Sequence, residues 1–154
     1  MRSEPKAFPF IEIVSHFIQS WVKSGMEYAL TVSLILLILE LFEAMMQYAP
    51  TLADVTARLY KWYHKSIFLF FLIHPTFYFV LYVVMETGVL NASMIIIIAM
   101  KVFDIFYKLE LIKSIYLKRS IPDDLAAMLS WRIPQWAFLT GVTLYPPLLY
   151  YALH

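Results

Sequence analysis

Apolar residues gather in four long segments of this chain, and shorter polar stretches separate them. The segments run over residues 26–48, 66–88, 90–114 and 133–153. Each has about the 20 largely apolar residues that a helix needs to cross the hydrocarbon core of a bilayer. The pattern therefore predicts an all-α integral membrane protein, a four-helix bundle of transmembrane helices over residues 26–154.

Residues 1–25 have a different, amphipathic pattern. Apolar residues between Phe10 and Val22 share one helical face, and polar residues such as Glu12, His16 and Lys23 occupy the other. This is typical of a helix that lies in the membrane interface, here starting near Pro9, or of a collar packed on the bundle. A signal peptide is not expected, because Glu12 interrupts the apolar run and no small-residue cleavage site follows it.

Ionisable residues form a narrow stripe on the third segment. Lys101, Asp104 and Lys108 follow a strongly apolar start and fall within about 60° of one another on a helix. Each uncompensated charge in a bilayer costs about 2.5–3.5 kcal/mol. We therefore expect the stripe to face something other than lipid.

The first segment carries a stripe of mainly opposite sign. Ser33, Glu40, Glu43 and Gln47 lie within about 80° on its helix. Three interpretations follow. The charges neutralise one another and fix the helix register, the stripe pairs with a partner subunit, or it forms a path for protons or cations.

The second segment holds His74 and Pro75 in its middle, at a depth similar to that of Glu40 and Asp104. A histidine before a proline favours a hydrogen-bonded kink. Haem ligation is not expected, because the other three histidines lie at or beyond the segment ends. A three-ligand metal site of His74, Glu40 and Asp104 requires suitable geometry, so neither a metal nor a cofactor is predicted.

Composition agrees with a membrane protein: 62% of the 154 residues are hydrophobic, against about 45–50% in soluble domains. Three glycines leave no GxxxG packing motif, and the absence of cysteine excludes disulfides and thiolate chemistry. A voltage sensor needs an arginine-rich helix, which the third segment is not.

The connections between segments carry the orientation signal. The first connection predicts a short interfacial helix, the second is tight at Thr87-Gly88, and a short helix is expected from Ser120 onward. Gly141 and Pro146-Pro147 are expected to kink or end the last helix. The first and third connections contain six lysine and arginine residues, and the other non-spanning parts contain three. The positive-inside rule then places both termini outside, in a plasma membrane such as the bacterial inner membrane.

The sequence thus predicts a non-enzymatic membrane protein, since no phosphate-binding glycine loop or nucleophile elbow is present. We expect a subunit or assembly component that associates with itself or with a larger membrane complex through its charged stripes. The alternative is a proton or cation channel or transporter. Expected partners are the bilayer and anionic lipid headgroups near the basic connections, and not nucleic acid. The candidate site is an intramembrane polar cluster of Glu40, Glu43, His74, Lys101, Asp104 and Lys108.

Overall fold

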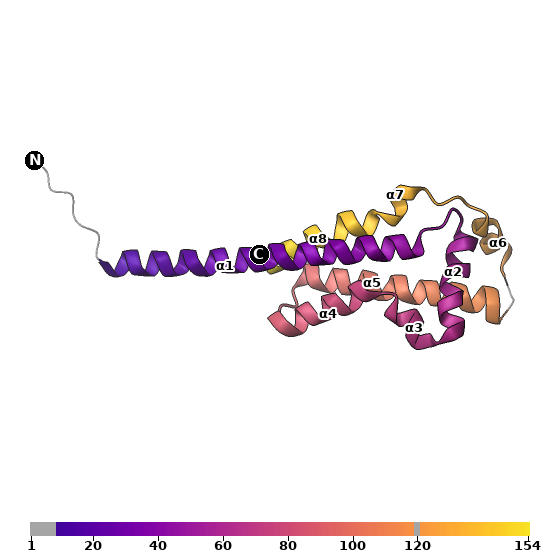
Figure 1. Ribbon diagram of the computed structural model, residues 1–154, viewed down its shortest axis with the longest axis horizontal. Coiled ribbons are helices and arrows are strands. Elements are labelled where there is room, and N and C mark those ends of the chain that lie inside the picture. The colour runs from indigo at the N-terminus through magenta and orange to yellow at the C-terminus, as the bar shows by residue number, and fades with distance from the viewer. Residues whose placement is uncertain (1–8, 119–120) are drawn as a thin grey trace, which may run out of the picture.

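A computed structural model describes residues 9–118 and 121–154 of the chain, with side chains from residue 23 onward, and its regular elements there are helices (Figure 1). The all-α class is therefore confirmed. The one β-type contact in the described part is an isolated bridge between Thr51 and Arg132. The helices are α1 (Pro9–Gln47), α2 (Leu52–Lys65), α3 (Ile67–Leu72), α4 (Pro75–Thr87), α5 (Ala92–Ile112), the π-helical continuation η1 (Lys113–Leu117), α6 (Asp123–Leu129), α7 (Gln135–Phe138) and α8 (Thr140–Leu153).

Four helices form the bundle: α1 packs against α8 and α4, and α5 packs against the same two helices. The helices α1 and α5 therefore face each other across the bundle. The first and third connections meet at one end, where the Ile133 N–H donates to the Pro50 carbonyl at 3.0 Å. The C-terminus and the second connection meet at the other end, where Asn91 Nδ2 donates to the Ala152 carbonyl at 2.7 Å. Successive bundle helices consequently alternate in direction.

Local sequence explains where several helices begin and end. The Asn91 side chain caps α5 by accepting the Met94 N–H at 3.1 Å. Gly88 ends α4 in the left-handed conformation, with φ of 68°, which glycine adopts without steric cost. The predicted tight turn at Thr87-Gly88 and the predicted helix in the first connection are both present, the latter as α2.

The predicted kink at His74-Pro75 is confirmed as a complete break between α3 and α4. Pro75 is the first residue of α4 and has no N–H to donate to the preceding turn. The His74 ring replaces part of the lost bonding, because its Nδ1 lies 2.9 Å from the Phe70 carbonyl. In a continuous helix that carbonyl would accept the His74 backbone N–H, which here bonds to Phe71 instead.

The four predicted spans are not four uninterrupted helices. Within the described residues, one helix segment, Lys23–Gln47 of α1, is by itself long and apolar enough to cross a membrane. The segment 66–88 is divided at His74 and the segment 133–153 at Leu139, while the 21-residue α5 carries the charged stripe. Pro146 and Pro147 do not end α8, which continues through both of them to Leu153, and a kink at this point stays a prediction.

The N-terminal region also differs from the prediction of a separate interfacial helix over residues 1–25. Residues 1–8 lie outside the described part, and α1 runs from Pro9 to Gln47 without a break at residue 25. Figure 1 shows the first part of α1 projecting beyond the other helices as a straight extension. Contact of this part with a membrane surface stays a prediction.

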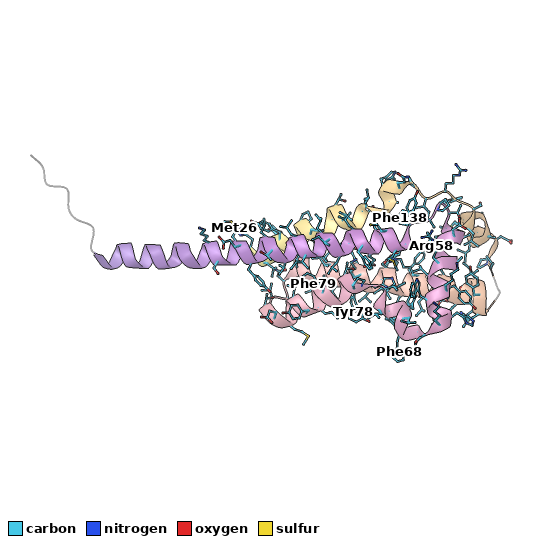
Figure 2. All side chains as sticks on the ribbon, viewed as in Figure 1. Met26, Arg58, Phe68, Tyr78, Phe79 and Phe138 are labelled. Atoms are coloured by element: carbon cyan, nitrogen blue, oxygen red, sulfur yellow. The ribbon has the colours of Figure 1, made fainter. Side chains whose placement is uncertain are left out.

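Two apolar clusters form the core, and they leave a polar layer between them. One cluster joins α1, α4, α5 and α8 near the C-terminal end, and includes Leu36, Ile97 and Leu149. The other joins α2, α3 and α5 near the basic connections, and includes Leu59 and Ile112. Large apolar side chains also cover the outside, and Phe68 and Tyr78 in Figure 2 are examples.

Candidate functional site

A single network of polar side chains connects α1, α4 and α5 between the two apolar clusters. We call it the polar network, and it consists of Glu40, Glu43, Gln47, Thr76, Lys101, Asp104 and Lys108. Most of its members are less than 10% exposed, although they carry charge or hydrogen-bonding groups. Such groups are stable in an apolar core only when they are paired, so their mutual geometry decides what the network can do.

Lys101 is the centre of the network because it contacts all three of the other bundle helices. Its Nζ lies 2.5 Å from Glu40 Oε1 and 3.8 Å from Glu43 Oε2, both on α1. It donates to Thr76 Oγ1 on α4 at 2.7 Å and lies 4.5 Å from the ring centroid of Tyr145 on α8. One ammonium group thus joins α5 to each of its neighbours and to the helix opposite.

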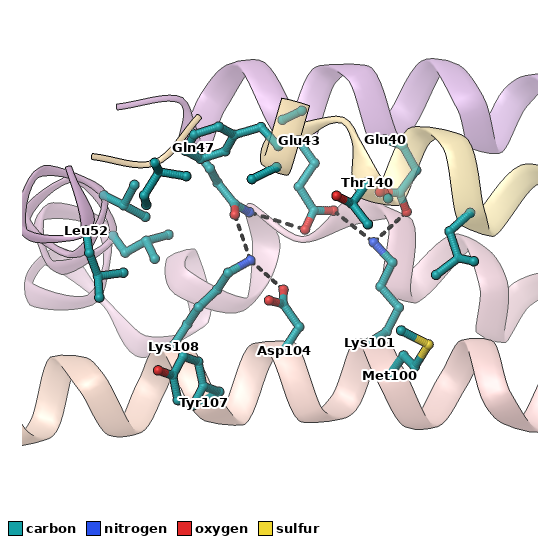
Figure 3. Close-up of a pocket in the computed structure, with 18 of the residues that line it drawn as sticks. Glu40, Glu43, Gln47, Leu52, Met100, Lys101, Asp104, Tyr107, Lys108 and Thr140 are labelled. Carbon is teal, nitrogen blue, oxygen red and sulfur yellow. Dashed lines mark hydrogen bonds and ion pairs between the residues drawn. The ribbon is translucent and has the colours of Figure 1, made fainter. Parts of the chain in front are cut away.

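The second half of the network runs from Glu43 to the other end of the stripe. Thr76 Oγ1 donates to Glu43 Oε2, and Gln47 Nε2 donates to Glu43 Oε1 at 3.2 Å. Lys108 Nζ donates to Gln47 Oε1 at 2.6 Å and also to Asp104 Oδ2 (Figure 3). Hydrogen bonds and ion pairs therefore run without interruption from Glu40 to Asp104.

A glycine on α8 makes room for the start of this chain. A Cβ atom at Gly141 would lie 2.5 Å from Glu40 Oε2 and 3.3 Å from the Tyr145 ring. Any larger residue would thus displace the carboxylate that pairs with Lys101. The chain contains no GxxxG motif. Gly141 by itself nevertheless allows α8 to lie close to α1 at the level of Glu40.

His74 lies beside the network and is almost fully buried, with 1% of its surface exposed. A carbonyl oxygen can only accept, so the Nδ1 contact with Phe70 places the ring hydrogen on Nδ1. The other ring nitrogen, Nε2, is buried and has no hydrogen-bond partner among the described residues. Ligand atoms of His74, Glu43 and Asp104 all lie within 4.8 Å of one another.

The structure brings all six sequence-predicted site residues into one region, and pairs the two charged stripes with each other. The three residues whose ligand atoms lie together include Glu43 and not Glu40, which the sequence had offered as a possible ligand and whose carboxylate pairs with Lys101. Sequence reasoning missed Thr76 and Tyr145, because single threonines and tyrosines are ordinary in apolar helices. The sequence did contain one signal for Thr76. Pro75 is the first residue of α4, so the next residue, Thr76, lies in the first turn at the level of His74.

A cavity of about 340 Å³ opens beside the network (Figure 3). Its walls come from α1, α2, α5, α7 and α8, and they include all the carboxylates and both ammonium groups of the network. Asp104 contributes the most accessible of these groups, with a side chain that is 41% exposed. The cavity therefore gives small polar species a place beside charged groups that are otherwise buried.

The arrangement offers paired charges, one free imidazole nitrogen and a mostly apolar cavity that the charged groups adjoin, and these suit binding and charge neutralisation. The Thr76 hydroxyl donates to the Glu43 carboxylate and accepts from the Lys101 ammonium, so it joins these two charged groups. Comparisons with protein families, curated proteins and solved structures give no match for the chain.

Proposed function

We propose that this chain is a non-enzymatic integral membrane protein that acts as a subunit or assembly component of a membrane complex. The observation that carries the proposal is the distribution of polarity in the bundle. Glu40 and Glu43 of α1 and Lys101 of α5 are buried and pair with each other, while large apolar residues cover the outside. This is the arrangement expected when the surroundings are lipid or another apolar surface.

The internal pairing changes which surface would meet a partner. The sequence suggested the charged stripes, but their groups already bond one another inside the chain. The outer face of α1 is the better candidate: its exposed side chains Leu34, Ile38, Leu41 and Met45 are spaced by four, three and four residues. This spacing matches a seam at which two helices interlock. We call these residues the α1 seam.

Photo-cross-linking in native membranes tests the proposal. A photoreactive residue at Ile38, which is 64% exposed, or at Met45, which is 75% exposed, should give one discrete adduct. Leu36, which is fully buried on the opposite face, is the matched control position and should give none. The adduct mass distinguishes a second 18.1-kDa copy from another protein. Lipid adducts alone from the α1 seam, together with a monomer in native mass spectrometry, would contradict the proposal.

We propose the orientation from the basic residues at one end of the bundle. Arg58, Lys61 and Lys65 lie on α2, and Arg132 lies beside it through the bridge to Thr51. This end would face the cytoplasm of a plasma membrane, with the anionic headgroups of its inner leaflet as neighbours.

Cysteine labelling tests this orientation cleanly, because the natural chain contains no cysteine. Ala53→Cys on α2 should react only after the membrane is permeabilised, whereas Glu86→Cys at the other end should react from outside; both positions are exposed. The reverse accessibility would invert the proposed orientation.

A second candidate function is a path for protons or cations, and the cavity beside the polar network favours it. In this case Glu40, Glu43, His74, Lys101 and Asp104 would carry or stabilise the charge as it crosses. Purified protein in liposomes should then conduct, and Glu43→Gln should abolish the current while the helix content is preserved. Tight liposomes with the wild-type chain would remove this candidate for the isolated protein.

A further inference from the structure

We propose that His74, Glu43 and Asp104 form a binding site for a divalent transition-metal ion, with zinc as the best-suited example. Imidazole nitrogen and carboxylate oxygen are ordinary zinc ligands, and three protein ligands with a remaining open position are typical of zinc sites that accept a further ligand. The inference does not depend on the proposed subunit function, because it concerns binding to the folded chain alone.

Geometry is the first support. Ligand atoms of the three residues lie within 4.8 Å of one another, although the residues come from three different parts of the fold. Tetrahedral zinc with ligands at about 2.0–2.2 Å holds them about 3.4 Å apart. Both carboxylates end flexible side chains, so small rotations toward a shared ion suffice.

The free nitrogen of His74 is the second, independent support. Nε2 is buried without a partner among the described residues, which is costly for a polar atom unless something binds it. Nδ1 is held by the Phe70 carbonyl, and this bond fixes both the tautomer and the direction of the ring. Histidines that bind metals are oriented in this way, by a backbone carbonyl or carboxylate behind the ring.

The neighbours of Glu43 orient it in the same manner. Thr76 donates to one carboxylate oxygen and Gln47 to the other, so each oxygen of the group has a hydrogen-bond donor. A carboxylate has about four lone-pair sites, and these two bonds leave capacity for a metal ion. Glu43 is therefore positioned as a ligand and not only as half of an ion pair.

Charge supports a cation at this place. The polar network contains three carboxylates, on Glu40, Glu43 and Asp104, and two ammonium groups, on Lys101 and Lys108. When all are ionised, one negative charge remains uncompensated in a mostly buried region. A divalent ion between Glu43 and Asp104 would change the net charge of the set from −1 to +1, and it would compete with Lys108, which donates to Asp104.

Zinc binding to the purified full-length chain tests the site. The protein should be purified in detergent with a tag that contains no histidine, treated with a chelator, and dialysed against zinc. We expect about one zinc per wild-type chain by mass spectrometry of the metal. His74→Ala, Glu43→Gln and Asp104→Asn should each weaken binding at least about tenfold, since even residues behind the ligands contribute about 10–100-fold.

Two control variants test whether the loss is specific. His154→Ala and Glu110→Gln remove exposed groups of the same chemical types outside the site and should leave binding unchanged. Circular dichroism checks that each variant keeps its helix content. If His74→Ala fails to fold, the two conservative carboxylate variants decide the question.

Lys108→Met supplies a test of opposite sign. Removal of the competing ammonium should strengthen zinc binding, whereas a variant that merely damaged the fold would weaken it. The visible spectrum of the cobalt-substituted protein should indicate the low coordination number of this ligand set. The proposal is overturned if folded wild-type protein binds no zinc, if the three ligand variants bind it as tightly as wild type, or if the controls lose it equally.

Discussion

Removal of the Lys101 ammonium should destabilise the bundle more than any other single change of charge. Lys101 is 4% exposed, and Glu40, its partner at 2.5 Å, is 5% exposed. Lys101→Met keeps the length of the side chain but leaves the Glu40 carboxylate without its cation. Loss of one partner from a buried ion pair costs about 3–5 kcal/mol, so we expect a decrease of that size in the free energy of unfolding.

The companion change should recover much of this loss. Glu40→Leu alone should cost less, about 1.5–3 kcal/mol, because the Lys101 ammonium keeps its hydrogen bond to Thr76 and its contact with Glu43 at 3.8 Å. In the double variant neither charge remains, and replacement of a buried pair by apolar residues is often neutral or stabilising. The double variant should therefore be more stable than the sum of the two single effects predicts, by at least about 3 kcal/mol.

Unfolding in mixed micelles, followed by circular dichroism during a denaturing-detergent titration, measures these differences. Glu27→Leu is the matched control on the same helix: its side chain is 68% exposed and its contact with Lys23 is 4.0 Å long. The control should change stability by no more than about 0.5 kcal/mol. Strict additivity of the two buried changes, or a Lys101→Met effect as small as that of the control, would refute the central role of the pair.

Two further predictions concern the neutral residues around the charges. Thr76→Val removes the hydroxyl that joins Lys101 to Glu43 and should cost about 1–3 kcal/mol. Thr31→Val, which removes an exposed hydroxyl bonded to its own helix, should cost about 0.5 kcal/mol or less in the same titration; equal effects would contradict a bridging role. Gly141→Ala should cost about 1–3 kcal/mol because its Cβ meets the Glu40 carboxylate. Gly25→Ala is the control, because the space around Gly25 is open, and it should raise helix stability by up to about 1 kcal/mol. Thermal unfolding measures both variants. A destabilised Gly25→Ala variant or an unaffected Gly141→Ala variant would contradict the packing argument.

The sequence predicted the helical class and the pairing of the two stripes for a simple physical reason. Charges in an apolar segment must face each other, and a period of about 3.6 residues shows which residues share a face. The break at His74 and the turn at Gly88 were predictable because proline and glycine act through local backbone geometry. These features depend on neighbours in the chain and not on the rest of the fold.

The position of a residue along the bundle axis was harder to predict than the helix face on which the residue lies. Glu40 and Glu43 are three residues apart, which is about 4.5 Å along a helix, and helix boundaries from sequence are uncertain by about 2–4 residues. The sequence therefore could not decide which glutamate meets Lys101 and which approaches His74. The continuous α1 was missed for a related reason: an amphipathic pattern and an apolar one can follow each other in a single helix without any break in backbone bonding.

The unequal number of opposite charges in the polar network connects the proposals. If all three carboxylates and both ammonium groups are ionised, the set carries one net negative charge. An unpaired charge in a poorly solvated region is costly. A bound divalent metal ion between Glu43 and Asp104 would supply more than the missing positive charge and leave the set at +1. A transferable proton on one carboxyl group would supply it in a conducting protein, and a fixed proton would supply it in a purely structural one. Zinc bound after dialysis would indicate the metal ion, and a current in liposomes would indicate the transferable proton. A chain that neither binds zinc nor conducts would have the fixed proton.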